Sequence, residues 1–174
     1  MPIIGPNILL PLSINSNDWF RHNSSGSSIS ADPDSGLIFS VVSGSSGWSC
    51  YILSRQNTYR YSDLYNKYIK ILVEFRNVSL GNNSIINWGI ATFPSPSPNS
   101  STSRTSFSVA SQDPSLFLPT TNGIYNAIKK FDENLMQNRL SSFSESDYVG
   151  AYCYLNGYPN DTFTLKRLEI HIIH

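Results

Sequence analysis

Short runs of apolar and β-branched residues, separated by turn-forming residues, recur along nearly the whole chain. The clearest runs are LIFSVV, WSCYIL, YIKILVEF, IINWGIATF, YVGAYCYL and FTLKRLEIHII, and the pieces between them include NSSGSS, DPDSG, LGNNS and NGYPND. Many short strands joined by turns rich in Gly, Pro, Asn and Ser are typical of antiparallel all-β domains. We therefore predict an all-β fold, a two-sheet antiparallel β-sandwich of the jelly-roll type, with space for one short helix.

The length of the chain favours one domain. Its 174 residues can bury one substantial core but not two, so we predict a single domain over residues 1–174. The segment PSPSPNSSTSR, residues 94–104, has the composition of a linker. It stands between two strand-like runs, and neither flank is long enough to form a domain alone. We expect it to be a long surface loop.

Residues 68–76, YIKILVEFR, alternate with period two, which places successive side chains on opposite faces of a strand. One face is apolar and is expected to lie in the core: Ile69, Ile71, Val73 and Phe75. The other face is amphipathic and is expected to point outward: Tyr68, Lys70, Leu72, Glu74 and Arg76. We take Tyr68, Lys70, Glu74 and Arg76 as candidate ligand-binding residues, because polar groups beside an aromatic ring suit a binding surface.

Residues 147–161, DYVGAYCYLNGYPND, alternate in the same way. Small apolar residues share one face, namely Val149, Ala151, Cys153 and Leu155, and the other face carries Tyr148, Gly150, Tyr152 and Tyr154. A tyrosine ring can contact the C–H face of a sugar while its hydroxyl stays polar. Tyrosine also has a high strand propensity, and aromatic pairs stabilise sheets without any ligand. The three tyrosines are therefore either ligand-binding residues or packing residues.

Trp48 and Arg55 are further candidate binding residues. Trp48 follows SGSSG at a junction of loop and strand, where a ring can lie at the rim of a groove. Arg55 follows the same strand-like run, where it can join a pocket wall or stay solvated. Trp88 is in phase with Ile86 and Ile90, so we expect it in the core.

Two features are expected to interrupt the regular pattern. In the last run, Phe163 and Leu165 are in phase with Leu168 only if one residue is inserted near 166–167, which predicts a β-bulge. Residues 122–143 place apolar side chains at helical spacing. A single crossing helix fits this segment, and so does an irregular strand followed by a loop.

The charge of the chain excludes two classes of partner. Only 14% of the residues are charged and the net charge is zero, whereas nucleic-acid affinity depends on neutralising phosphates with a basic surface. No polybasic cluster is present to bind an anionic membrane, and no segment approaches the ~20 apolar residues of a membrane span. The start, MPIIGPNILLPL, lacks the basic region of a signal peptide. We expect neither a nucleic-acid nor a membrane partner.

Motifs for catalysis and metal binding are lacking in the sequence. The candidate acids Asp63, Glu74, Asp147 and Glu169 belong to no motif, no GxSxG surrounds a serine, and no Cys/His cluster has zinc spacing. We expect no catalytic residues, no enzyme activity and no cofactor. The DPDSG segment, residues 32–36, either forms a turn unaided or holds a structural calcium. A disulfide between Cys50 and Cys153 and two buried thiols both fit the pattern.

Three segments resemble the jelly-roll carbohydrate-binding modules found in glycoside hydrolases and in phage tail and baseplate proteins. NILLPLSINSNDWF (residues 7–20) is similar to the usual start of that family, and YRYSDLYNKYIKILVEFR (59–76) to its central turn and alternating strand. In this central turn, Asn66 occupies a position where the family commonly has glycine, and asparagine tolerates the left-handed turn conformation. NDTFTLKRLEIHII (160–173) is similar to its terminal strand, which returns beside the first.

The resemblance implies a β-sandwich that binds saccharide without catalysis and sometimes holds a structural calcium. The Ser- and Asn-rich, charge-poor composition favours a phage setting, in which the chain is made in the host cytoplasm and built into the virion. Its partners would then be a host cell-wall polysaccharide or oligosaccharide and other tail or baseplate proteins. An extracellular module of a larger protein, a structural virion module that docks through its tyrosines, and a small hydrolase are the alternatives.

Overall fold

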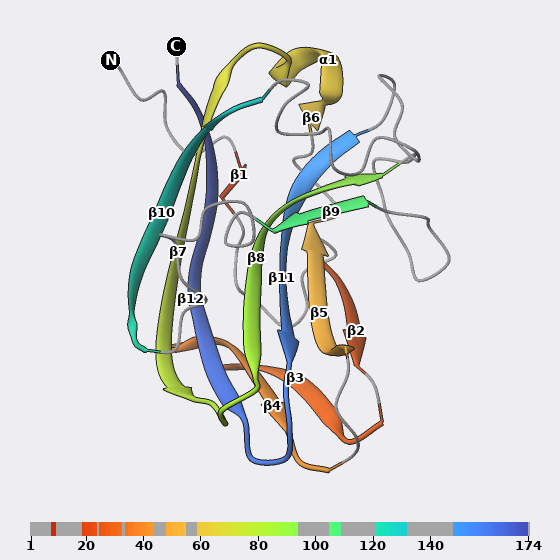
Figure 1. Cartoon of the computed structure of the whole chain (residues 1–174), viewed down its shortest axis with the longest axis vertical. Helices are drawn as coiled ribbons and strands as arrows, with labels where there is room; N and C mark the ends of the chain where they lie inside the picture. Colours follow the sequence, from red (N-terminus) through yellow and green to blue (C-terminus); the bar gives the residue numbers. More distant parts are fainter. Residues whose placement is uncertain are drawn as a thin grey trace.

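The computed structural model describes residues 8–9, 19–23, 25–32, 34–43, 48–54, 59–93, 105–108, 121–131 and 148–173. In these ranges the chain forms two six-stranded sheets that pack face to face (Figure 1), and the paired strands are antiparallel. One short helix, α1 (Tyr61–Leu64), follows strand β6. The structure confirms the predicted all-β, two-sheet antiparallel sandwich with one short helix.

The first sheet contains the alternating strand of residues 68–76. Its order is β10-β7-β12-β4-β3, and β1 pairs with β12. The bounds of these strands are β10 (Gly123–Lys130), β7 (Tyr68–Ser79), β12 (Thr162–Ile173), β4 (Gly36–Val41), β3 (Ser27–Asp32) and β1 (Ile8–Leu9). The pairing of β1 with β12 confirms that the last strand returns beside the first.

The second sheet contains the tyrosine-rich strand. Its order is β2-β5-β11-β8-β9, and β6 pairs with β11. The bounds are β2 (Trp19–Asn23), β5 (Trp48–Ser54), β11 (Tyr148–Asn156), β8 (Ile85–Phe93), β9 (Thr105–Ser108) and β6 (Tyr59–Arg60). Strands β8 and β9 pair with each other, so residues 94–104, which lie outside the described residues, join two neighbouring strands of one sheet.

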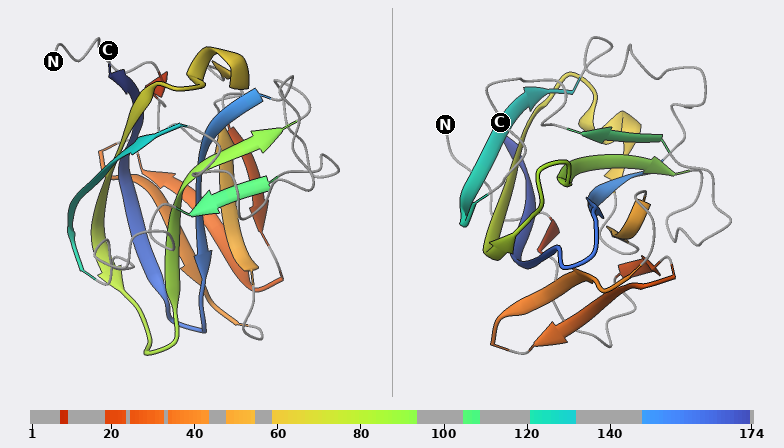
Figure 2. Two further views of the ribbon diagram at one scale, coloured as in Figure 1. Left: turned by 45° about the horizontal axis from the view of Figure 1, so that its top comes forward. Right: turned by 60° about the horizontal axis from the view of Figure 1, so that its bottom comes forward.

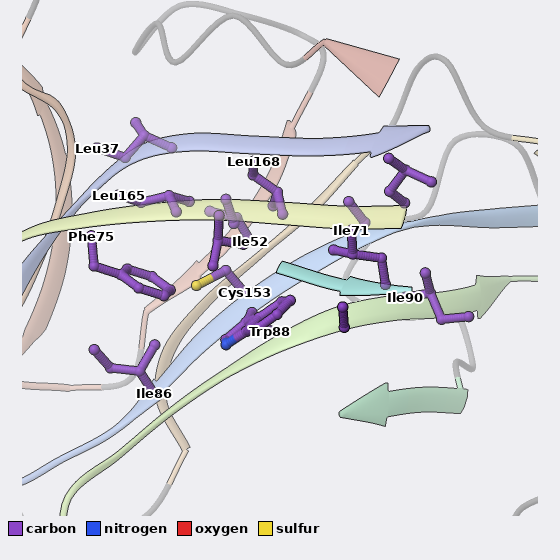
Figure 3. Close-up of a cluster of buried hydrophobic side chains, with 14 of the residues drawn as sticks. Leu37, Ile52, Ile71, Phe75, Ile86, Trp88, Ile90, Cys153, Leu165 and Leu168 are labelled. Carbon is purple, nitrogen blue, oxygen red and sulfur yellow. The ribbon is translucent and has the colours of Figure 1, made fainter. Parts of the chain in front are cut away.

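The inner faces of the two sheets form one core. Ile69, Ile71, Val73 and Phe75 are at most 1% exposed, and so are Val149, Ala151, Cys153 and Leu155. Figure 3 shows side chains of both sheets meeting in this layer, among them Phe75 from β7 and Trp88 from β8. The period-two predictions for both strands, and the core position predicted for Trp88, are confirmed.

The two expected interruptions have different outcomes. Strand β12 shifts register against β7 between Leu165 and Arg167, which confirms the predicted β-bulge. The extra residue lets Phe163 and Leu165 face the core on one side of the bulge and Leu168 on the other. The helical interpretation of residues 122–143 is wrong for its first part, because Gly123–Lys130 form the strand β10. Pairing with β7 overrides the helical spacing there, and residues 132–143 lie outside the described residues.

Asn66 has a left-handed backbone conformation (φ 61°) in the turn between α1 and β7, as the sequence predicted. Its N–H donates to the carbonyl of Phe131 (2.8 Å), which ties the turn to the end of β10. We expect Asn66→Ala to lower the free energy of unfolding by about 1 kcal/mol, because a Cβ-bearing residue without a polar side chain is strained there. The control Asn66→Gly should retain wild-type stability within ~0.5 kcal/mol in chemical denaturation. Equal losses in both variants would contradict this explanation.

Candidate functional site

The structure divides the candidate site residues between opposite sides of the sandwich. Tyr68, Lys70, Glu74 and Arg76 lie in β7 of the first sheet, whereas Tyr148, Tyr152 and Tyr154 lie in β11 of the second sheet. Each set points away from the core, because the alternate residues of each strand are buried in it. The sequence pattern predicted both sets as candidate ligand-binding residues without placing them on a common sheet. Period two identifies the buried face of a strand but not the sheet to which the strand belongs.

Several charged groups on the outer face of the first sheet are paired with a neighbour in the same strand. Arg76 Nη2 lies 2.5 Å from Glu74 Oε1. Arg167, across from Glu74 on β12, donates to the carboxylate of Glu169, and Nε2 of His171 lies 2.8 Å from Glu169 Oε2. Glu169 is only 2% exposed. Each of these contacts joins residues of the same strand, and those of Arg167 and His171 compensate the buried carboxylate of Glu169.

Glu169 makes the stability of the chain depend on pH. Its burial alone would raise the pKa of the carboxyl, but hydrogen bonds from Arg167 and His171 hold the pKa below its ordinary value of 4.5. A lowered folded-state pKa stabilises the fold above the unfolded-state pKa, and the contribution is lost as the pH falls through the folded-state pKa.

We therefore expect the free energy of unfolding to fall as the pH is lowered below 4.5. In Glu169→Gln, which cannot ionise, this fall should be shallower than in the wild type. Urea denaturation at a series of pH values measures both slopes. Identical slopes would mean that other groups produce the acid sensitivity.

The outer face of the second sheet is the stronger candidate site. In the β11–β8 register, Tyr152 stands opposite Gly89 and Tyr154 opposite Asn87. Toward the other end of β11, Tyr148 stands opposite Arg60 of β6. We call Tyr148, Tyr152, Tyr154, Asn87 and Arg60 the tyrosine face.

Tyr152 and Tyr154 form a stacked pair with different exposure. Their ring centroids are 6.0 Å apart and the ring planes differ by 15°. Tyr152 is 1% exposed, whereas Tyr154 is half-buried. Tyr152 was a candidate for direct ligand contact, but its ring is inaccessible in this structure, and it supports the ring of Tyr154 instead. Gly89, directly across from Tyr152, has no side chain that would occupy the space beside that ring.

Asn87 fixes the accessible tyrosine from the neighbouring strand. Its Nδ2 donates to the hydroxyl of Tyr154 over 2.6 Å, and the Asn87 residue is only 6% exposed. The sequence analysis missed Asn87, although the signal was present in IINWGIATF. Asn87 is the polar residue between Ile86 and Trp88, both of which face the core, and it therefore belongs to the outer face.

A second aromatic position lies near the start of β11. The guanidinium of Arg60 lies over the ring of Tyr148, 5.1 Å from its centroid, and Nη2 donates to the Tyr148 hydroxyl over 3.1 Å. Tyr148 is half-buried and Arg60 is exposed. A cation above an aromatic ring is attracted by the negative face of the ring. Arg60 therefore orients Tyr148, and the sequence analysis did not select it.

The remaining candidates are placed only in part. Trp48 begins β5, and its backbone stands opposite Asn156 of β11, near Tyr154, but its side chain lies outside the described residues. Arg55 and the whole segment 55–58 lie outside them as well. The interpretation of Trp48 as the rim of a groove therefore stays a prediction, and so does that of Arg55 as part of a pocket wall. The same holds for the cysteine pair: Cys153 is buried, and Cys50 is described only as a backbone position opposite Leu155.

The DPDSG segment closes through its own backbone. The carboxylate of Asp32 accepts the N–H groups of Asp34 (2.8 Å) and Ser35 (3.0 Å), and these bonds lower the pKa of Asp32. Gly36 completes the turn with φ 111°, where a Cβ would lie 2.4 Å from the carbonyl oxygen of Leu165. Within the described ranges, no group of three or more His, Cys, Asp or Glu could hold a metal ion. No helix in those ranges is both long and apolar enough to cross a membrane.

Carboxylates are absent from the strands that carry the tyrosine face. The described strands β2, β5, β6, β8, β9 and β11 contain no Asp or Glu. Glu74 and Glu169 belong to the first sheet, Asp63 accepts the N–H of Arg60 at the start of α1, and Asp147 lies outside the described residues. Glycoside hydrolysis usually requires two carboxyl groups held across the sugar. The described strands of this face carry aromatic rings and hydrogen-bonding groups.

Comparison with known proteins supports the fold. No protein-family model matches the chain, and no curated protein sequence matches it either. The chain is similar to the native family 12 xyloglucanase from Bacillus licheniformis (TM-score 0.50, 11% identity), and the match covers 97% of this chain and 98% of that one. It is also similar to the xylan-binding module CBM15 (TM-score 0.45, 17% identity), with 96% of each chain covered. The xyloglucanase match agrees with a β-sandwich architecture over the length of this chain.

Proposed function

We propose that the chain is a non-catalytic carbohydrate-binding module that holds a saccharide on its tyrosine face. The observation that carries this proposal is the half-buried ring of Tyr154, which is stacked on the buried Tyr152 and tethered by Asn87. A ring held from two sides loses little conformational freedom when a ligand binds. It offers an apolar surface to the C–H groups of a sugar, and the polar groups beside it serve the sugar hydroxyls.

The absence of carboxylates from the described strands of the second sheet supports binding without turnover. A glycosidase whose site lay on this face would take both acids from loops, since its strands carry none. The fold itself is compatible with either activity, because one fold hosts many functions. The proposal of a non-catalytic module therefore rests on the composition of the face and not on the fold.

We place the module in a phage tail or baseplate, where its ligand would be a polysaccharide or oligosaccharide of the host cell wall. This setting is supported by the resemblance of residues 7–20, 59–76 and 160–173 to such modules, and by the Ser- and Asn-rich composition. A shallow site of this kind binds weakly by itself, and repetition in an assembly supplies the avidity. An extracellular module of a larger protein is the alternative setting.

Binding to a panel of polysaccharides tests the function directly. The purified chain should be retarded in gels that contain the right cell-wall polysaccharide, and the released reducing ends should stay at the level of a blank without protein. Retardation with release of reducing ends would make the chain a hydrolase. An absence of retardation across wall polysaccharides, together with retention on isolated tail or baseplate proteins, would support the structural module instead.

A further inference from the structure

Strand β10 forms one edge of the first sheet. Among the described strands it pairs with β7 alone, over the eight residues Gly123–Lys130. In both Figure 1 and Figure 2 no further strand is drawn beyond it. An edge strand presents unpaired backbone N–H and C=O groups, which can pair with a strand of another chain.

Large apolar side chains are exposed on the outer face of this edge. Ile124 is 57% and Ile128 is 55% exposed, and the exposed Asn126 lies midway between them. In β7, the residue beside Ile124 is Glu74 and the residue beside Ile128 is Lys70. Two isoleucines on one face of an open strand form an apolar stripe flanked by opposite charges.

We infer that β10 pairs with β10 of a second copy of this chain, antiparallel and about a two-fold axis at Asn126. Ile124 and Ile128 each lie two residues from Asn126. Ile124 of one copy therefore stands opposite Ile128 of the other copy. This is the register that opposes every exposed isoleucine of the strand with an isoleucine. Opposed side chains in an antiparallel pair have Cβ atoms about 4.5–5.5 Å apart and so lie in direct contact. Such a self-complementary patch is what a two-fold dimer requires.

Like charges are not brought together in the same register. In the joined sheet, Glu74 and Ile124 of one copy lie in one row with Ile128 and Lys70 of the other copy. A carboxylate lies at one end of this row and an ammonium group at the other. Lys129 stands opposite Gly123 of the other copy, and Lys130 opposite Asn122. No like charges in β10 are therefore directly opposed, an arrangement that would otherwise destabilise the pair.

The dimer has a consequence for binding to a surface with repeated ligands. A dimer carries two tyrosine faces. Once one face has bound a ligand on such a surface, the other face of the same dimer meets a neighbouring ligand at a high effective concentration. The edge strand β10 belongs to the first sheet and the tyrosine face to the second. Pairing through β10 therefore leaves the tyrosine faces uncovered.

Single-cysteine variants test the register. Under mild oxidation, Asn126→Cys should form a disulfide-linked dimer, because its thiols face each other across the two-fold axis. Ile128→Cys alone should not, since its thiols are offset by four residues, about 13 Å along the strands. A mixture of Ile124→Cys with Ile128→Cys should cross-link again. The wild-type chain is the control, because it shows how much cross-linking the native Cys50 and Cys153 produce. Equal cross-linking of Ile128→Cys alone, or none with Asn126→Cys, would overturn the register.

Sedimentation of the full chain tests the dimer itself. The wild type should show a sedimentation coefficient that rises with protein concentration, and Ile128→Lys should remain monomeric at every concentration. Val42→Lys is the matched control, because Val42 is a branched apolar residue that is 72% exposed at the end of β4, and it should sediment like the wild type. A wild type that stays monomeric, or a dimer that persists in Ile128→Lys, would overturn the inference.

Discussion

Replacing Asp161 by alanine is expected to lower the free energy of unfolding by about 3–5 kcal/mol, a large share of the usual 5–15 kcal/mol. Asp161 is 3% exposed, and its carboxylate accepts three hydrogen bonds, from the N–H of Gly81 (2.7 Å), the hydroxyl of Ser84 and the N–H of Tyr158. These partners belong to the two turns that join β7 to β8 and β11 to β12, at the lower end of Figure 1. Alanine would leave the donors around Asp161 without an acceptor.

The reason for so large an effect is the position of the two turns. Each turn carries the chain from one sheet to the other, since β7 and β12 belong to the first sheet and β8 and β11 to the second. The backbone of Asp161 adds a third connection, because its carbonyl accepts the N–H of Val41 at the end of β4. The carboxylate thus holds together the end of the sandwich where both sheets are joined.

Chemical denaturation of matched variants separates this role from a general effect of charge. Ser84→Ala removes one of the three bonds and should cost about 1 kcal/mol. Asp34→Ala removes an exposed carboxylate in the β3–β4 turn and should stay within ~0.5 kcal/mol of the wild type. A loss for Asp161→Ala no larger than that for Asp34→Ala would show that the buried carboxylate does not stabilise the turns.

Replacing Tyr154 by alanine is expected to weaken saccharide binding at least ~tenfold, which corresponds to ~1.4 kcal/mol. This variant removes the accessible ring of the stacked pair, and the ring of Tyr152 that remains is only 1% exposed. Tyr154→Phe keeps the ring but removes the hydroxyl that accepts from Asn87. It should retain most of the affinity and lose some stability, because the buried amide of Asn87 loses that partner.

Tyr68→Ala is the matched control for the binding measurement. Tyr68 is also a tyrosine on an outer sheet face and is 46% exposed, but it belongs to the first sheet. Its removal should leave the affinity unchanged. Thermal melting of each variant establishes that it is folded before its affinity is compared with the wild type. Equal losses of affinity in Tyr68→Ala and Tyr154→Ala would contradict a site on the second sheet.

Much of the fold follows from local pattern. The alternation in residues 68–76 and 148–155 identifies the buried side of β7 and β11, and the change of phase near 166–167 identifies the bulge in β12. These features are encoded by neighbouring residues, because the side-chain period of a strand is two. Residues 123–130 show the limit of such patterns. The spacing of their apolar residues fits a helix, but they form a strand because they pair with β7.

The arrangement of the site could not be predicted in the same way. Which strands share a sheet depends on pairing between distant segments, and so the sequence pattern could not separate the outer face of β7 from that of β11. The different exposure of Tyr152 and Tyr154 also has no signature in the sequence, as both tyrosines have the same phase. Asn87 and Arg60 gain their roles only through the register that places them beside Tyr154 and Tyr148.

The most direct test of a saccharide site on the tyrosine face is an NMR titration of the isotope-labelled chain with a fragment of a polysaccharide that retards it in gels. The amide signals of β11 and β8 around Tyr154 and Asn87 should shift in proportion to the bound fraction, and those of β7 and β12 should stay in place. Shifts confined to β7 and β12 would place the site on the other sheet and contradict the account.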